Sequence, residues 1–387
     1  MSWFNFQKVF QFSSDSADFL SRFLRLAIVN IISNLLVPIA GLLDVAFLGH
    51  LSEIRHLAGV ALATIVFNYL YWTFGFLRMG TTGMAAQAMG RKDTDALVLI
   101  AVRNGAIAVV LGLTISILKF PIQQFAFTLL SASPEVKASA QVFYNALIWG
   151  APATLLNFVL LGWFLGRSQS SKVLVMSVVN NVCNVVLDYL FVVRWGWEST
   201  GAGASTAIAQ YLMLAVGLGF ISREISVQQV RSLLPDLLDA SALKAVFTLN
   251  RDLLIRTLAL ISTFAVFTNL SSTFGTDVLT TNTLLLQVVT LSAYFIDGFA
   301  FATETLAGTF YRERSQLLRL VRISGTFCFS VGILFASAFV LVPTPLFRLL
   351  TNHVDVLDRI RDSVIWLLPV LGFGSIAYML DGYFLGL

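Results

Sequence analysis

The run FLRLAIVNIISNLLVPIAGLLDVAFLG, residues 23–49, carries a carboxylate inside a segment that is long enough to cross a membrane. Backbone polar groups in lipid must be satisfied within the segment, so the run predicts a helix. At 100° per residue its polar and helix-bending positions fall within about 140° of arc. They are Asn30, Ser33, Asn34, Pro38, Gly41 and Asp44. The predicted helix therefore has one polar wall and is otherwise apolar.

The whole chain resembles this segment in composition. Hydrophobic residues make up 57% of it, charged residues 12%, and the mean hydropathy is +0.82, whereas about 25% of residues are charged in soluble domains. This composition predicts an all-α polytopic membrane protein. The expected spans are residues 23–49, 57–79, 96–118, 140–166, 171–193, 203–222, 246–272, 278–301, 320–342 and 363–387.

Basic residues predict how these helices are oriented. Lys and Arg are more frequent in the loops on the side of the N-terminus, which is typical of the cytoplasmic face. Residues 1–22 are therefore expected to be a cytoplasmic segment, without a cleaved signal peptide, of a multi-pass protein in the inner or plasma membrane. The net charge of +4 needs no nucleic acid as a partner. The expected partners are the lipid bilayer and a small organic substrate, and the chain is expected to be monomeric.

Cysteine and histidine give little chemistry to build on. Cys183 and Cys328 lie inside apolar runs and are interpreted as small buried hydrophobes. His50, His56 and His353 fall in predicted loops, and none pairs with another at metal-ligand spacing. We therefore expect no metal site, no cofactor and no enzyme activity.

A polar interruption at residues 223–244 divides the chain into six predicted helices and then four. Residues 23–222 are expected to form an N-lobe, 223–245 a cytoplasmic linker and 246–387 a C-lobe. A weak internal repeat supports two lobes, because FTLLSASPEV (127–136) aligns with FRLLTNHVDV (347–356). In the same register GWFLG (162–166) aligns with GYFLG (382–386).

The repeat also predicts how a complete second lobe would continue. Counterparts of residues 167–220, two further helices, would follow Leu387. The expectation is therefore a bundle of twelve helices of which the last two are not in this chain, either because it is a truncated product or because it is a fragment.

Two carboxylates are the first candidates for function, because an acid inside a membrane helix costs about 2.5–3.5 kcal/mol to insert. Asp44 shares its helix with Pro38, which should bend the helix and suits a mobile gate. The alternative is an acid near the helix end that only contacts headgroups. Asp188 lies on a second polar arc, of about 80°, together with Ser177, Asn180 and Asn184. Two acids facing one cavity would form a proton site, unless these polar side chains serve only to join helices.

The second half of the chain offers weaker candidates. Asp297 and Glu304 are seven residues apart in AYFIDGFAFATETLAG (293–308) and lie near one helix face. Glu304 is interpreted as an acid at the cytoplasmic end that reaches the headgroups. Asp297 is expected either to line a cavity or to cap a broken helix. Asp381 aligns with Leu161 in the repeat, so the fold itself does not require an acid there.

Four segments together resemble the DinF branch of the multidrug and toxic compound extrusion (MATE) transporters. They are PIAGLLDVAFLGHL, VVNNVCNVVLDYLFV, RDLLIRTLALI and YFIDGFAFATETLAG, and the resemblance runs in order over residues 23–387. It implies two lobes around a central cavity and export of organic compounds against an inward flow of protons or sodium ions. By this resemblance Asp44 matches the first-helix acid of the proton-coupled members, and Asn184 and Asp188 match their fifth-helix pair, so these residues are expected to form the proton-coupling and substrate cavity. Asn157 and Thr206 would line the same N-lobe cavity.

The resemblance favours protons as the coupling ion. Sodium-coupled relatives carry a Glu in the seventh helix, whereas this helix begins RDLLIRTLALI and has no acid beyond Asp252. The leading hypothesis is an antiporter that exports lipophilic cations in exchange for protons. One alternative is a flippase for a lipid-linked intermediate, whose cavity should be markedly cationic. We place only Arg103 and Arg256 within helices, which argues against this alternative. Another is an inactive, truncated transporter that acts as a membrane assembly partner.

Overall fold

The structure is a computed structural model that describes residues 14–51, 53–237, 239–349 and 354–387. Within these ranges ten helical stretches are long and apolar enough to cross a membrane, which confirms the predicted all-α membrane protein. The stretches are Asp18–Gly49, Arg55–Gly90, Thr94–Ile117, Pro134–Gly166, Ser170–Arg194, Glu198–Ile221, Lys244–Thr273, Val278–Thr309, Arg314–Leu341 and Asp355–Gly386.

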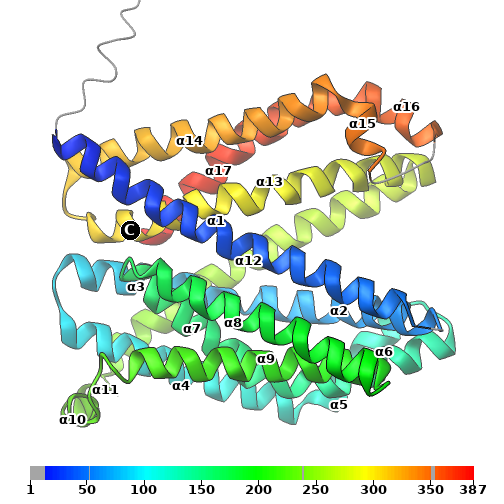
Figure 1. Cartoon of the computed structure of the whole chain (residues 1–387). Coiled ribbons are helices and arrows are strands. Elements are labelled where there is room, and N and C mark those ends of the chain that lie inside the picture. The colour runs from blue at the N-terminus through cyan, green and yellow to red at the C-terminus, as the bar shows by residue number, and fades with distance from the viewer. Residues whose placement is uncertain (1–13, 52, 238, 350–353) are drawn as a thin grey trace, which may run out of the picture.

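The helices fall into two lobes that lie one above the other in Figure 1. The N-lobe contains α2 to α9: α2 (Arg55–Thr73), α3 (Phe76–Gly90), α4 (Thr94–Ile117), α5 (Lys119–Leu129), α6 (Pro134–Leu147), α7 (Ala151–Gly166), α8 (Ser170–Asp188), which continues as a π-helical turn (Tyr189–Arg194), and α9 (Glu198–Ile221). The C-lobe contains α12 (Ala240–Thr273), α13 (Thr276–Thr309), α14 (Arg314–Leu341), α15 (Pro343–Phe347), α16 (Val354–Ser363) and α17 (Leu367–Gly386). Two short helices, α10 (Val227–Ser232) and α11 (Leu234–Leu237), lie in the predicted linker.

Helix α1 (Ser14–Gly49) belongs to neither lobe alone, because it crosses from one to the other (Figure 1). In its first half Phe23 packs against Phe299 of α13, with ring centroids 6.1 Å apart. Near its end Phe47 packs against Tyr189, directly after α8, at 6.4 Å. One face of α1 is therefore held by the C-lobe and its last turns by the N-lobe.

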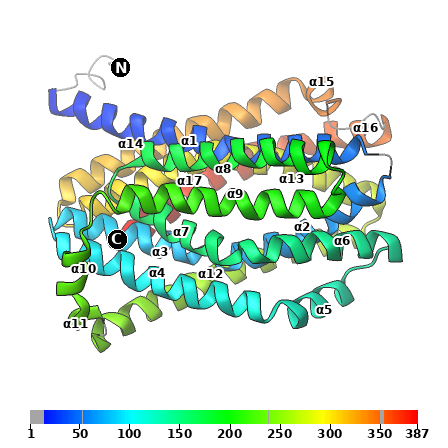
Figure 2. The same ribbon diagram turned by 60° about the horizontal axis from the view of Figure 1, so that its bottom comes forward.

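The two ends of the bundle differ in what they hold. At one end, here called the linker end, lie α10, α11, the start of α1 and the end of α17 (Figures 1 and 2). At the other, the far end, lie α5, the start of α6, α15 and α16. The positive-inside pattern predicts that the linker end faces the cytoplasm.

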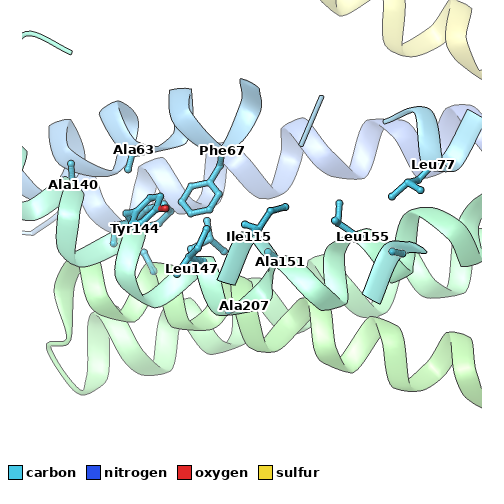
Figure 3. Packing of buried hydrophobic residues seen from close by; sticks show 14 of the residues in the cluster. Ala63, Phe67, Leu77, Ile115, Ala140, Tyr144, Leu147, Ala151, Leu155 and Ala207 are labelled. Atoms are coloured by element: carbon cyan, nitrogen blue, oxygen red, sulfur yellow. The ribbon is translucent and has the colours of Figure 1, made fainter. Parts of the chain in front are cut away.

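The N-lobe core is built around aromatic packing between α2 and α6 (Figure 3). Phe67 lies 5.3 Å from Tyr144, ring centroid to centroid. The Tyr144 hydroxyl donates a hydrogen bond to the backbone oxygen of Lys119 at 2.9 Å, so this buried phenol is satisfied. Offset or tilted aromatic pairs add about 0.5–1.5 kcal/mol beyond their buried area.

Local sequence signals explain several helix starts. Asp93 accepts from the backbone N–H of Ala96 and caps α4, and Ser133 accepts from Val136 ahead of Pro134 at the start of α6. Ser226 caps α10 in the same way. These side chains satisfy backbone donors that the first helical turn leaves free.

Two predicted spans ended too early at the linker end. The span predicted at 57–79 continues through α3 to Gly90, and the span predicted at 278–301 continues through α13 to Thr309. Both extensions are rich in Gly, Ala and Thr (TTGMAAQAMG and ATETLAGT), so they have modest hydropathy. They are buried where α3 meets α13 and α17, because small side chains let helix backbones approach closely.

Candidate functional site

The structure brings Asp44 of α1 and Asp188 of α8 together. Their carboxyl groups lie next to each other. Asp44 Oδ1 and Asp188 Oδ2 are buried without a hydrogen bond from the described residues. An ionised carboxylate has only acceptors, so a hydrogen bond between the two groups would require a proton on one of them. Asp188 is buried, at 1% exposure, whereas Asp44 is half-buried. The pair is therefore a site that can hold one proton between two helices.

Neighbouring polar side chains hold Asp188 in place. The Ser205 hydroxyl of α9 donates to Oδ1 of Asp188, and the amide of Asn184, one helical turn earlier on α8, lies beside this carboxyl group. The same amide donates to the Thr206 hydroxyl at 3.3 Å. Ser205 was not among the residues singled out from the sequence, because a Ser in a small-residue helix gives no local signal. Ser205 thus orients Asp188 from the neighbouring helix α9.

Asn157 and Asn180 occupy different surroundings in the same lobe. Asn157 of α7 is buried, and its amide donates to Gln210 of α9, to the backbone oxygen at 2.9 Å and to Oε1 at 3.0 Å. Asn180 is half-buried, and its side-chain oxygen is buried without a hydrogen bond from the described part of the chain. Asn157 therefore joins α7 to α9, while Asn180 keeps a free acceptor.

Asn34 and Pro38 lie elsewhere along α1. The Asn34 amide donates to the backbone oxygen of Tyr294 in α13 at 3.3 Å, so it contacts the C-lobe. Ten residues separate it from Asp44, about 15 Å along a helix. Helix α1 stays helical through Pro38. Pro38 has no N–H to donate to the Asn34 carbonyl, so a flexible point remains the prediction for this position.

The two secondary candidates, Asp297 and Asp381, lie in the C-lobe. Asp381 of α17 forms an ion pair with Arg256 of α12, whose guanidinium also lies 3.6 Å from the sulfur of Met79 in α3. Asp297 is half-buried and interacts electrostatically with both partners of this pair and with Arg78. Helix α13 runs unbroken past Asp297, so the interpretation of Asp297 as the cap of a broken helix was wrong.

Glu304 does not reach the headgroups as the sequence analysis expected. It is fully buried, at 0% exposure, and its Oε2 lies 3.8 Å from Nη1 of Arg78. The expectation was wrong because the neighbouring small residues allow α3 to pack directly over this part of α13. Arg78 was also missed as a basic residue inside the bundle, since it stood at the edge of the span predicted at 57–79.

One histidine also differs from its prediction. His56 is not in a loop but in the first turn of α2, where it is buried. Its Nδ1 lies 3.0 Å from the Ser199 hydroxyl, and its Nε2 lies 3.1 Å from Glu198 of α9. His50 follows α1 and is exposed, and His353 lies outside the described residues. Among the described residues no group of His, Cys, Asp or Glu is arranged to hold a metal ion.

The basic residue at the linker has a structural role. Arg103 of α4 donates to the backbone oxygens of Asp236 and, at 3.1 Å, of Leu237. These oxygens lie at the C-terminal end of α11, where a helix carries partial negative charge. Arg103 therefore fastens the linker to the N-lobe and does not lie between the lobes.

Comparison with known proteins agrees with this architecture. The MatE family model matches residues 30–190. DNA damage-inducible protein F of Escherichia coli (strain K12) is 34% identical over 365 residues, 93% of this chain and 79% of that protein. A probable multidrug resistance protein NorM of Acinetobacter baylyi is 24% identical over 291 residues, 74% of this chain and 64% of that protein.

Among solved structures, an outward-facing conformation of a multidrug resistance MATE family transporter of the MOP superfamily has a TM-score of 0.82 to this chain. The match covers 94% of this chain and 82% of that chain at 21% sequence identity. At this level of identity the likeness shows the shared fold.

Proposed function

The chain belongs to the MATE family of membrane transporters, and we propose that it exports small organic cations in exchange for protons, which bind between Asp44 and Asp188. The observation that supports this proposal is that the Asp44 carboxyl group of α1 lies next to the Asp188 carboxyl group of α8, where one proton held between them would remove the repulsion of two like charges. Losing that proton leaves two like charges close together, and a bound organic cation would compensate them. Proton and substrate would therefore compete for one site.

The position of the pair supports exchange across the membrane. Asp44 lies in the last turns of α1 and Asp188 at the end of α8, so both are in the half of the bundle toward the far end. Helix α1 contacts both lobes, and a change of charge at Asp44 acts on the helix that joins them. Alternating access requires such a connection between the binding site and the relative position of the lobes.

Sodium coupling and lipid flipping receive less support from the same residues. The only acid in the first part of α12, Asp252, is exposed and pairs with the neighbouring Arg251 at 2.8 Å. A flippase for an anionic lipid-linked intermediate would need unpaired cations in its cavity. Arg256 is instead paired with Asp381.

Transport into sealed proteoliposomes tests the proposal. With a lipophilic fluorescent cation as substrate, uptake is expected to follow an imposed pH gradient and to ignore a sodium gradient of equal size at fixed pH. Asp44→Asn and Asp188→Asn should abolish the pH-driven uptake, while the exposed control Asp252→Asn should retain it. A strict sodium requirement at fixed pH would overturn the assignment of protons as the coupling ion.

A further inference from the structure

The lobes touch each other closely at the linker end. Helix α3 of the N-lobe packs against α13 and α17 of the C-lobe. A Cβ atom added at Gly308 of α13 would lie 3.0 Å from the Gly386 backbone oxygen and 3.2 Å from the Gln87 backbone nitrogen. The Gln87 amide of α3 donates to the Gly386 oxygen at 3.1 Å. The two lobes therefore meet at the linker end through backbone-to-backbone packing, here called the seal.

An ion pair spans this seal. Arg78 comes from α3 and Glu304 from α13, so the pair joins the N-lobe to the C-lobe at 3.8 Å. The guanidinium also lies over the ring of Phe301, 4.1 Å from its centroid, which fixes its position against the C-lobe. Neither Glu304 oxygen accepts a well-formed hydrogen bond from the described residues, although Thr82 lies beside the carboxyl. Arg78 is thus the main compensation for a fully buried charge.

The surrounding charges make Glu304 dependent on this partner. Asp381 faces the Glu304 carboxyl with the same sign, and Arg256 with the opposite sign, but Arg256 is already paired with Asp381. Asp297 also interacts with Arg78, so two carboxyl groups share this one guanidinium. A buried carboxylate that loses its only close counter-ion is strongly destabilised. Separating the lobes must therefore be coupled to hydration of Glu304 or its protonation.

We propose that Arg78 and Glu304 form an ionic latch that keeps the linker end shut and breaks when the lobes separate there. The latch is a different site from the proton pair. Asp44 and Asp188 lie toward the far end, whereas Arg78 and Glu304 lie toward the linker end. The inference rests on the proposed alternating access between the lobes. With the latch closed, protons and substrate are expected to reach the Asp44–Asp188 pair only from the far end.

Chemical access to a buried position on α3 measures the latch directly. Ala86 has 0% exposure and faces Gly308 across the seal. In a variant with Cys183 and Cys328 replaced by Ser, Ala86→Cys provides a single thiol at this seal. Purified protein in detergent is treated with a charged, water-soluble maleimide, without substrate or an ion gradient.

Breaking the latch should expose this thiol. Glu304→Gln preserves the side-chain volume but removes the charge, and it should raise the labelling rate at least tenfold. Exchanging the two residues, Arg78→Glu with Glu304→Arg, restores an ion pair and should return the rate to within about threefold of the parent. The matched control Asp252→Asn, an exposed acid on α12, should leave the rate unchanged.

Two results would overturn the latch: slow labelling in Glu304→Gln, or equally fast labelling in the exchanged pair and in either single variant. Size-exclusion profiles identify any variant that does not fold. If a variant does not fold, Arg78→Lys is used instead, because it keeps the charge but loses the contact of the guanidinium with the Phe301 ring. Its labelling rate should lie between those of the parent and Glu304→Gln. A labelling rate equal to that of the parent counts against the latch. Labelling needs no ion gradient, so a failure of proton coupling leaves this result independent.

Discussion

Replacing Asp44 by Asn is expected to abolish the proton release that accompanies binding of an organic cation. On the proposed mechanism, the parent holds one proton between the Asp44 and Asp188 carboxyl groups before the cation binds. In Asp44→Asn the amide can donate to the Asp188 carboxylate without any bound proton. The variant therefore resembles the proton-loaded pair at nearly constant volume, but it has no proton to exchange.

The magnitude follows from the single shared proton. If the free protein holds one proton and the complex holds none, raising the pH by one unit favours the complex tenfold, or about 1.4 kcal/mol. The sign is fixed by which state binds more protons: the free state does, so the cation binds more tightly as the pH rises. For Asp44→Asn the logarithm of the affinity should change by less than about 0.2 per pH unit between pH 6 and 8, against about one for the parent.

Equilibrium binding of a fluorescent lipophilic cation to purified protein at pH 6, 7 and 8 gives these slopes. Calorimetry in buffers of different ionisation enthalpy counts the released protons independently. Asp252→Asn, an exposed acid on α12, should retain the parental slope. If Asp44→Asn still releases one proton per bound cation, the proton is held elsewhere and the reasoning fails.

Three further predictions concern stability and the linker. Arg256→Ala leaves Asp381 unpaired and should destabilise the protein by about 1–2 kcal/mol, less than the 3–5 kcal/mol typical of fully buried pairs because both side chains are about one-third exposed. Thermal unfolding, followed by thiol labelling of the buried Cys328, measures this loss. Adding Asp381→Asn to Arg256→Ala should recover part of the stability, and an equal loss in the single and the double variant would contradict the prediction. His56→Ala removes the contacts with Ser199 and Glu198 of α9 and should lower the free energy of unfolding by about 1–3 kcal/mol in the same assay. An unchanged melting temperature would show that these contacts do not contribute to stability. Arg103→Ala should speed limited proteolysis within the linker several-fold while leaving the other loops as resistant as in the parent, and an unchanged cleavage rate would refute its role as a fastener.

The sequence could identify Asp44 and Asp188 as candidate residues, but it could not predict that they lie next to each other. Asp44 and Asp188 could be identified because each stands on a helix whose other polar residues share its face. Their meeting could not be read from either helix, since it depends on how α1 crosses between the lobes. Asn34 stands on the same predicted wall as Asp44, yet it bonds to α13 in the other lobe. A shared helix face does not imply a shared site when the helix contacts different partners along its length.

By itself the sequence determined the class of protein and the ten apolar spans found in the described residues, because the apolar length of a segment is a local property. Only the tertiary structure decided which charges pair. Glu304 looked like an acid at a helix end, and Arg78 lay at the edge of a predicted span, because the small-residue stretches that continue both helices have modest hydropathy. Those small side chains let α3 and α13 approach closely enough to bury both charges together. Such an approach is set by two surfaces from different lobes, and no single segment of the chain encodes it.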